Sequence, residues 1–294
     1  MVFQIILGLS LSALIGLVGY WRNSLSPSGV LGAVLTGTLI FGLGGIVPGT
    51  LLVAFFVSSS VLSHYRAQAK ERLADKFQKG SRRDLGQALA NGGWATVMVL
   101  ILSLTLSPAL FAALVGALAA VTADTWATEV GVLSSQPPRL VTTGRSVPIG
   151  TSGGITILGA MVSLFGGLFI GVIAVISIYA VSLFLPDWLG AAPPVLVRPA
   201  SLFVLPVIGG VSGLLGSLFD SLLGATVQAI FYCDRCHKET ERPRHSCGAQ
   251  TRLLRGYGWL DNDVVNFLAS VAGSAVAVLV FSLFVSAFAG SSGG

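Results

Sequence analysis

The chain has 294 residues, of which 53% are hydrophobic and only 10% carry a charge. Soluble domains usually contain about 25% Asp, Glu, Lys and Arg, so an ordinary soluble enzyme is excluded. Together with 37 glycines and a mean hydropathy of +0.85, the composition predicts an all-α, polytopic integral membrane protein, because small residues let helices pack closely in lipid. The 17 basic residues lie in short segments beside apolar runs, so no nucleic-acid partner is expected.

Eight apolar runs are long enough to predict membrane-spanning helices. They are 2–20, 30–45, 50–63, 87–106, 109–121, 155–185, 200–230 and 264–289. The sixth and seventh runs would each measure about 46 Å as straight helices, against a hydrocarbon core of about 30 Å. We therefore expect them to be tilted or broken, with Gly166-Gly167 and Gly209-Gly210 as candidate break points. Eight crossings are predicted, and ten stay open as an alternative.

Lys and Arg are concentrated in alternate connections between these runs. All of them except Arg198 lie in the first, third, fifth and seventh connections. Cytoplasmic loops collect Lys and Arg, so these four connections are predicted to be cytoplasmic and both termini to lie outside. The most basic connection, 64–84, is expected to be a solvated helix or surface arm near anionic lipid. The first run lacks the features of a signal peptide and is predicted to be a retained helix.

Three acidic residues lie in or beside apolar runs, where a charge costs about 2.5 to 3.5 kcal/mol on insertion scales and therefore suggests a function. Asp124 and Glu129 follow the fifth run, and Asp220 interrupts the seventh. Asp124 and Glu129 are about 140° apart around a regular helix, so they converge on one ion only if the helix ends or unwinds between them. The alternative for Glu129 is an interfacial position without chemistry.

Polar and small residues recur at helical spacing around Asp220, which predicts one stripe that faces protein or water. The members of this stripe are Ser217, Asp220, Ser221, Gly224 and Gln228. Asn262 and Asn266 are one turn apart at the start of the last run. Either capping and packing or substrate contact would explain these two asparagines.

A glycine- and arginine-rich connection, 139–154, immediately precedes the sixth run. Glycines let backbone amides approach an anion, arginines bind phosphate oxygens, and a helix N-terminus favours negative charge. The candidate phosphate-binding residues are Arg139, Arg145, Ser146, Gly150, Thr151, Gly153 and Gly154. The alternative is a basic juxtamembrane turn, since the segment matches neither a Walker sequence nor a dinucleotide fingerprint. With the three acids, this connection suits Mg²⁺-assisted phosphoryl transfer, although the acids alone equally suit a transported cation.

All three cysteines lie in one short connection, as a C-x2-C pair followed by H-x-C. The four candidate ligands of a structural Zn²⁺ are Cys233, Cys236, His245 and Cys247. His237 competes with His245 for the fourth place, and unbound or redox-active thiols are the alternative. A stable disulfide is not expected in the cytoplasm. We therefore predict one membrane domain, 1–294, with a zinc-ribbon-like insertion at about 233–263.

Four segments carry a family resemblance. They are Asp124-Thr-Trp-Ala-Thr-Glu-Val-Gly, Ser146-Val-Pro-Ile-Gly-Thr-Ser-Gly-Gly, Gly216-Ser-Leu-Phe-Asp-Ser-Leu-Leu-Gly-Ala-Thr-Val-Gln and Trp259-Leu-Asp-Asn-Asp-Val-Val-Asn. As a set they resemble the transmembrane protein 19 family, also called domain of unknown function 92, over nearly the whole chain. The plant member with an assigned activity is the plastid phytyl-phosphate kinase, which phosphorylates a prenyl monophosphate to the diphosphate. The cysteine segment is similar to that of prokaryotic members, so a prokaryotic cell membrane is the expected location.

A more distant similarity links the fifth connection to membrane polyprenol kinases and lipid cytidylyltransferases, which use CTP. It rests on Asp124-x-x-Ala-x-x-x-Gly131 followed by Gly144-Arg-Ser-Val-Pro-Ile-Gly-Thr151. Ile149 stands where many of those kinases have Glu, and Glu129 is a candidate for the missing carboxylate.

The resemblance implies an enzyme that converts an isoprenoid (phytyl-like) monophosphate to its diphosphate with a nucleoside triphosphate, CTP being the first expectation. Asp124, Glu129 and Asp220 would hold Mg²⁺. Arg145 would act with them, the other residues of the fifth connection would bind phosphate, and Ser217, Gln228, Asn262 and Asn266 would contact or support the substrate. The alternatives are a transporter or lipid-handling protein with an intramembrane cation site, and a nucleotidyltransferase that forms a CDP-lipid.

Overall fold

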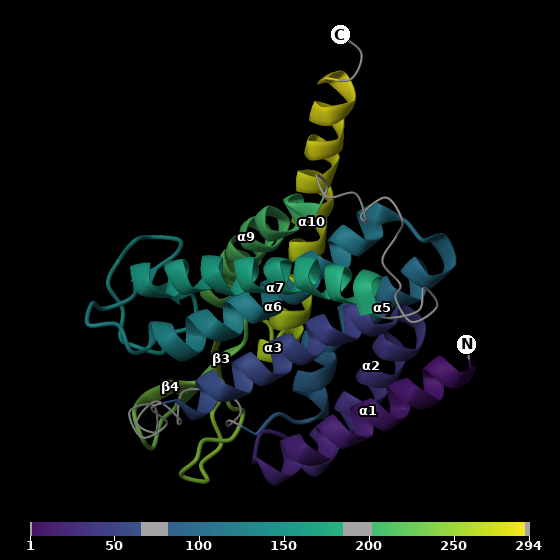
Figure 1. The fold of residues 1–294 in the computed structure, drawn as a ribbon. Helices are drawn as coiled ribbons and strands as arrows, with labels where there is room; N and C mark the ends of the chain where they lie inside the picture. The colour runs from purple at the N-terminus through teal and green to yellow at the C-terminus, as the bar shows by residue number, and fades with distance from the viewer. Residues whose placement is uncertain (1, 66–81, 185–201, 292–294) are drawn as a thin grey trace.

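The computed structural model describes residues 2–65, 82–184 and 202–291. Eight long helices occur in this part of the chain (Figure 1): α1 (Val2–Trp21), α2 (Pro27–Gly44), α3 (Ile46–His64), α5 (Leu85–Thr105), α6 (Pro108–Gly131), α7 (Ile157–Phe184), α9 (Val204–Thr226) and α10 (Asn262–Ser291). Each is long and apolar enough to cross a membrane. Every predicted run corresponds to one of these helices, so the prediction of a helical protein with eight candidate membrane-spanning helices is confirmed for the described part of the chain. Most of the basic third connection and Arg198 lie outside the described residues.

Local sequence signals set several helix ends. The Ser26 side chain accepts the backbone N–H of Gly29 at the start of α2, where Pro27 occupies the first turn. Asp84 and Gln87 form a reciprocal capping box at the start of α5, each side chain accepting the other residue's backbone N–H. Such caps satisfy N–H groups that have no partner inside the helix. Helix α2 is separated from α3 by Gly45 alone, whose φ of 79° favours glycine.

Helix α6 continues ten residues beyond the predicted end of its apolar run, to Gly131. The polar side chains in this extension do not interrupt it, because they bond to their own helix. Thr122 Oγ1 donates to the carbonyl oxygen of Leu118 (2.6 Å), and Thr125 Oγ1 donates to that of Val121 (2.8 Å). Asp124 and Glu129 therefore both belong to a regular helix.

Helices α7 and α9 are each continuous through their glycine pairs, so the alternative of a break at these pairs is wrong. The pairs are instead the places where α7 and α9 touch. A Cβ atom on Gly167 would overlap the carbonyl oxygen of Gly209, and one on Gly209 would overlap that of Gly167. The glycines allow two backbones to lie in direct contact, which is the use of small residues expected between membrane helices.

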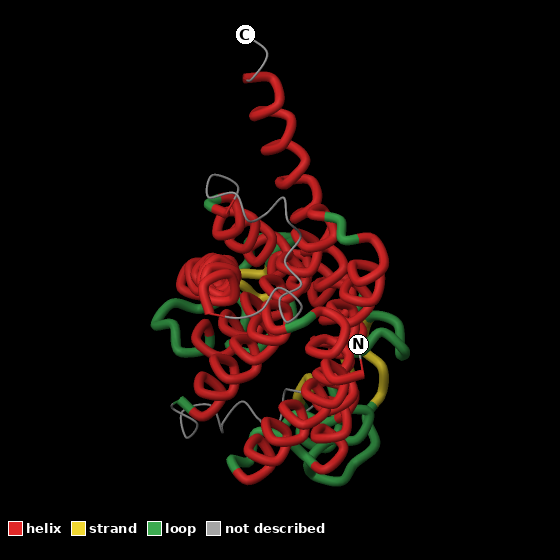
Figure 2. The backbone as a smooth tube through the Cα atoms, turned by 45° about the vertical axis from the view of Figure 1, so that its right-hand side comes forward, coloured by secondary structure: helices red, strands yellow, loops and turns green. Residues whose placement is uncertain are grey.

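Helix α6 is the centre of the packing. Every residue from Phe111 to Ala123 is buried, because α7, α9 and α10 pack extensively on α6, with α3 and α5 also in contact. A second group consists of α1, α2, α3 and α5, in which α2 packs on the other three. Figure 2 shows the last turns of α10 extending beyond the other helices.

The described strands lie in two of the odd-numbered connections. In the fifth connection, β1 (Arg139–Leu140) pairs with β2 (Gly154–Ile155). In the seventh, β3 (Ile230–Cys233), β4 (Lys238–Thr240) and β5 (Arg252–Arg255) form an antiparallel sheet in the order β4-β3-β5. These strands are additions to the predicted all-helical fold. Figure 1 shows the start of α1 and the end of α10 away from β3 and β4.

Hydrogen bonds join these connections to one another. The backbone N–H of Ser26 donates to the carbonyl oxygen of Arg83 (2.9 Å), which links the first connection to the third. Arg255 Nη2 donates to the carbonyl oxygen of Ser152 (3.3 Å), which links the seventh to the fifth. Within the described residues, the first connection is therefore next to the third, and the seventh is next to the fifth.

Candidate functional site

Asp124 of α6 and Asp220 of α9 meet where three helices converge. Ser217 Oγ donates to Asp124 Oδ1 (3.2 Å), and Ser163 Oγ of α7 donates to Ser217 Oγ (3.1 Å). Asp220 interacts electrostatically with Asp124. Its Oδ2 atom is buried and has no hydrogen-bond partner among the described residues.

The chemistry of this pair fits a cation. A buried polar atom without a hydrogen-bond partner lowers the stability of the fold. Two like charges held close together lower it further. Carboxylate oxygens are the preferred protein ligands of Mg²⁺. Asp124 and Asp220, which the sequence singled out, are thus the candidate metal-binding pair.

Glu129 lies elsewhere. Because α6 is regular through Gly131, Glu129 points about 140° away from Asp124. Its Oε1 accepts a hydrogen bond from Ser63 Oγ of α3 (2.6 Å), and it interacts electrostatically with Arg83. The structure therefore places Glu129 on the α3 side of α6, and the three predicted acids do not form one cluster.

A different carboxylate approaches the pair. Glu241, which directly follows β4, interacts electrostatically with Asp220. Gln228 Nε2 donates to Glu241 Oε1 (3.1 Å), and Gln228 Oε1 accepts from Ser152 Oγ (2.8 Å). Sequence reasoning missed Glu241, because its approach depends on the pairing of β3 with β4. No residue spacing in the sequence predicts that strand pairing.

The predicted stripe on α9 does face protein. Ser217, Gly224 and Gln228 are buried, whereas Asp220 and Ser221 are half-buried. Arg255 Nη1 donates to the carbonyl oxygen of Gly224 (2.8 Å), so one guanidinium ties the end of α9 to the fifth connection. Burial lowers the pKa of Arg255, and the nearby Glu239 and Glu241 oppose this shift.

The glycine-rich connection is a hairpin, in which some candidate phosphate-binding residues are exposed and others are half-buried. The backbone turns through left-handed conformations at Gly144, Gly150 and Gly153. The side chains of Arg139, Arg145 and Ser146 are exposed, whereas Gly150, Thr151, Gly153 and Gly154 are half-buried. Gly153 packs directly against Ala225, just beyond the acidic part of α9. The glycine end of the hairpin thus lies beside α9, and its two arginines are exposed.

Several of these groups already have partners within the hairpin. Arg139 Nη1 donates to the carbonyl oxygen of Gly144 (3.0 Å), and Thr151 Oγ1 donates to that of Pro148 (2.7 Å). Thr156 Oγ1 accepts the backbone N–H of Gly159 (2.9 Å) and so caps the start of α7. One of the N–H groups expected to attract an anion there is therefore satisfied internally.

The two asparagines lie in the first turns of α10. Asn266 Nδ2 donates to the carbonyl oxygen of Asn262 (2.9 Å). The capping residue is Asp261, whose Oδ1 accepts the backbone N–H of Val264 (3.1 Å). In the described part of the chain, no hydrogen bond joins either asparagine to Asp124 or Asp220.

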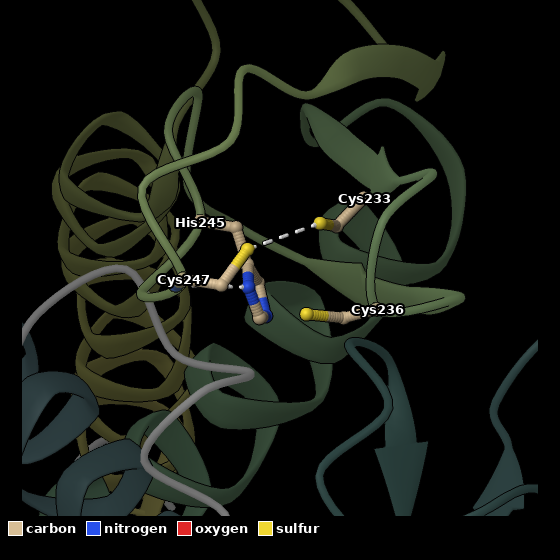
Figure 3. Close-up of side chains that lie close together, drawn as sticks. All are labelled: Cys233, Cys236, His245 and Cys247. Atoms are coloured by element: carbon tan, nitrogen blue, oxygen red, sulfur yellow. Dashed lines mark hydrogen bonds between the residues drawn. The ribbon is translucent and has the colours of Figure 1, made fainter.

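The cysteine connection gathers four side chains that could hold a metal ion. The ligand atoms of Cys233, Cys236, His245 and Cys247 all lie within 4.8 Å of one another, and Figure 3 shows the side chains pointing toward a common centre. Cys233 Sγ and Cys247 Sγ are 3.7 Å apart. A tetrahedral Zn²⁺ with Zn–S bonds of about 2.3 Å separates its sulfurs by about 3.8 Å, whereas a disulfide needs about 2.05 Å.

Two further observations favour a metal ligand set. The backbone N–H of Cys247 donates to His245 Nδ1 (3.3 Å), while Nε2 of this 4% exposed histidine is buried without a hydrogen-bond partner among the described residues. Hydrogen bonding from the backbone of Ala249 lowers the pKa of Cys247 to about 6, which favours the thiolate that metals bind. His237 is exposed and outside the group.

Comparison with known proteins supports the architecture. Residues 10–274 match the family described as Integral membrane protein DUF92. Protein PGR of Arabidopsis thaliana is 34% identical over 299 residues, covering 95% of this chain and 98% of that protein.

Two further relatives are more distant. An uncharacterized membrane protein of Methanocaldococcus jannaschii is 26% identical, over 87% of this chain and 86% of its own length. Protein VTE6, chloroplastic, of Arabidopsis thaliana is 25% identical, over 88% of this chain and 66% of its own. No solved structure matches the chain. The family match includes all eight described helices at least in part, and the chain belongs to the DUF92 family of integral membrane proteins.

Proposed function

We propose that this chain is a Mg²⁺-dependent phosphotransferase that converts an isoprenoid monophosphate to the diphosphate with a nucleoside triphosphate, CTP being the first candidate donor. The observation that carries the proposal is the half-buried pair Asp124 and Asp220, in which one buried carboxylate oxygen has no hydrogen-bond partner among the described residues, beside a glycine-rich hairpin. Membership of the DUF92 family supports it, because the family resemblance includes a plastid phytyl-phosphate kinase and VTE6 is a chloroplast relative.

In this mechanism Asp124 and Asp220 would hold Mg²⁺, and Glu241 adds a third negative charge on the side of the seventh connection. The metal would supply charge neutralisation at the phosphates. Ser217 orients Asp124, and Gln228 orients Glu241. The half-buried glycines of the hairpin offer backbone amides to phosphate oxygens, and the exposed Arg139 and Arg145 attract the nucleotide.

The phosphate monoester itself is the nucleophile. One of its oxygens forms a bond to the terminal phosphorus of the donor, and the bond from that phosphorus to the nucleoside diphosphate breaks. No general base is needed, because the monoester dianion already carries the attacking electron pair. The protein's contribution is therefore positioning and charge stabilisation.

The cysteine ribbon, defined as residues 233–247, has a structural role in this proposal. A Zn²⁺ bound by four protein ligands has no open position for chemistry. It would instead fix the turn that follows β4, and so hold Glu241 next to Gln228. The ribbon is thus proposed to position a carboxylate of the acid site.

The proposed orientation places the acid site and hairpin at the cytoplasmic end, where nucleoside triphosphates are available. The alternating distribution of Lys and Arg supports this orientation. A full-length fusion with alkaline phosphatase after Gly294 is expected to be active, and the matching green fluorescent protein fusion dark. The reverse result would contradict the orientation.

The decisive experiment offers phytyl and geranylgeranyl monophosphates to the detergent-purified protein, each with CTP, UTP, ATP or GTP and Mg²⁺. Asp124→Asn is the control. Prenyl diphosphate and nucleoside diphosphate formed only by the wild type would establish the reaction. Release of inorganic diphosphate would instead indicate nucleotidyl transfer that forms a CDP-lipid. Folded protein that yields no product with any pair would contradict the proposal.

Transport is the second candidate function. The hydrogen-bonded series Ser163, Ser217 and Asp124 joins three helices within the apolar core, and such buried acids also occur in ion pathways. This function predicts cation- or proton-coupled flux in liposomes without consumption of nucleotide.

A further inference from the structure

A cavity lies among α1, α2, α3 and α5, on helices other than those that form the acid site. It contains about 600 Å³ of empty space, including its open mouth, and its walls are mostly apolar. No residue of α6, α7, α9 or α10 lines it.

The cavity runs from the end with the basic connections into the middle of the helices. Arg83 and Gln87 line it at the start of α5, and Asn91 lines it one turn further along. On α2 its walls reach Phe41, which is 14 residues after Pro27 and so about 21 Å along the helix. One end is therefore polar and the other is deep among apolar side chains.

Arg83 is a buried cation in the cavity wall. Only 9% of it is exposed, and its guanidinium lies 5.7 Å from the ring centroids of Phe55 and Phe56, which also line the cavity. Arg83 Nη1 donates to Ser60 Oγ (2.9 Å). A guanidinium has five N–H donors, and within the described residues no carboxylate forms an ion pair with this one. It can therefore still bind an anion.

A second polar group also faces this space. Asn91 Oδ1 is buried and has no hydrogen-bond partner in the described ranges, while Asn91 Nδ2 donates to the carbonyl oxygen of Gln87. The free oxygen can accept a hydrogen bond from a hydroxyl group. This acceptor cannot bond to a phosphate dianion, which has no proton to donate, so the match to a phosphate monoester with one apolar chain rests on the cation near the mouth of the apolar cavity.

We propose that this cavity binds the chain of a single-chain isoprenoid monophosphate, with the phosphate at Arg83. The identity of this occupant rests on the proposed function. Arg83 lies within electrostatic range of Glu129, and Glu129 is five residues along α6 from Asp124, about 7.5 Å along the axis. The head of the bound molecule would thus lie at the same end of α6 as the acid site.

Binding can be measured without catalysis. Radiolabelled geranylgeranyl monophosphate is titrated into detergent-purified full-length protein, with neither nucleotide nor Mg²⁺ present. Arg83→Gln is expected to weaken binding at least tenfold, and so is Ala33→Phe, which fills the cavity from α2. Arg82→Gln and Leu35→Phe are the matched controls, because these exposed neighbours do not line the cavity. Size-exclusion chromatography and thermal midpoints identify the variants that fold.

The outcomes separate this inference from the proposed function. Tight binding that survives both Arg83→Gln and Ala33→Phe would overturn the inference, as would a wild type that does not bind the probe. Binding lost only in Asp220→Asn would place the ligand at the acid site and overturn it too. Displacement by phosphatidylglycerol as effective as by unlabelled probe would assign the cavity to a bilayer lipid instead. Binding with the expected pattern but without turnover would leave the inference intact and refute the kinase activity.

Discussion

Asp220 carries a polar atom that a bound ligand would satisfy. One of its carboxylate oxygens is buried and unbonded within the described structure, and Asp124 is its electrostatic neighbour. We expect Asp220→Asn to lower Mg²⁺-dependent phosphate transfer at least about a hundredfold, since stabilisation by a bound metal is worth several kcal/mol and 1.36 kcal/mol is tenfold in rate. Product formation under saturating Mg²⁺ measures this loss.

The same substitution should not unfold the protein. It removes one of two neighbouring like charges that are half-buried, so the thermal midpoint in Mg²⁺-free detergent is expected to stay the same or rise. Ser221→Ala, at the half-buried neighbouring position, is the matched control and should retain activity. Wild-type turnover by Asp220→Asn would remove the proposed metal site.

Glu239 lies in β4 and Glu241 directly follows it, so substitutions at these two positions can be compared directly. Glu241 receives a hydrogen bond from Gln228 and interacts with Asp220, whereas Glu239 is exposed. Glu241→Gln is expected to raise the Mg²⁺ concentration for half-maximal activity about tenfold, equivalent to about 1.4 kcal/mol, while Glu239→Gln leaves it unchanged. Equal effects of the two substitutions would show that only the overall charge of the ribbon matters.

At the residue scale, the sequence predicted what depends on chemistry inside one segment. Asp124 and Asp220 stand out as charges in apolar runs, and the ribbon ligands stand out by their spacing. Contacts between segments were not visible. Glu129 turns toward Ser63 of α3, and Glu241 reaches Gln228 only because β4 pairs with β3. Both placements depend on packing that no local pattern encodes.

At the scale of elements, the hairpin of the fifth connection depends on its glycines for two different reasons. Gly144 and Gly153 have φ values of 66° and 82°, so alanine at either position costs about 1–2 kcal/mol of backbone strain. A Cβ atom on Gly144 meets nothing within 4 Å, whereas one on Gly153 would overlap Ala225. Gly153→Ala should therefore cost a further 1–3 kcal/mol or so from overpacking.

Chemical denaturation or thermal midpoints of the two alanine variants in the same detergent measure this difference. Because Gly153 lies where the hairpin meets α9, Gly153→Ala should also reduce phosphate transfer, while Gly144→Ala retains it. Indistinguishable stability of the two variants would show that the hairpin does not pack on α9 as described.

The helices themselves were predictable because each needs only a long apolar run. In the two longest runs, the breaks considered at the glycine pairs do not occur. Glycine weakens an isolated helix, but Gly167 and Gly209 lie where α7 and α9 touch, and there the absence of a side chain permits close backbone contact. Whether a glycine ends a helix or joins two helices depends on the partner, which the sequence of one helix does not reveal.

At the scale of the whole molecule, the ribbon connects parts that are far apart in the chain. Its sheet begins four residues after α9, Arg255 of β5 bonds both to α9 and to the fifth connection, and Glu241 bonds to Gln228. A metal that fixes the ribbon should therefore influence the acid site, although none of its four ligands belongs to that site.

Cys247→Ser tests this coupling. We expect the wild type to contain one Zn²⁺ per chain by elemental analysis and the variant to lose it, because a missing thiolate opens a four-ligand site. Phosphate transfer should fall with it, and the Mg²⁺ requirement should rise as in Glu241→Gln, since both changes release the same carboxylate. His237→Ala is the control, because this exposed histidine lies outside the ligand group. Loss of zinc with an unchanged Mg²⁺ requirement would show that the ribbon folds independently of the acid site.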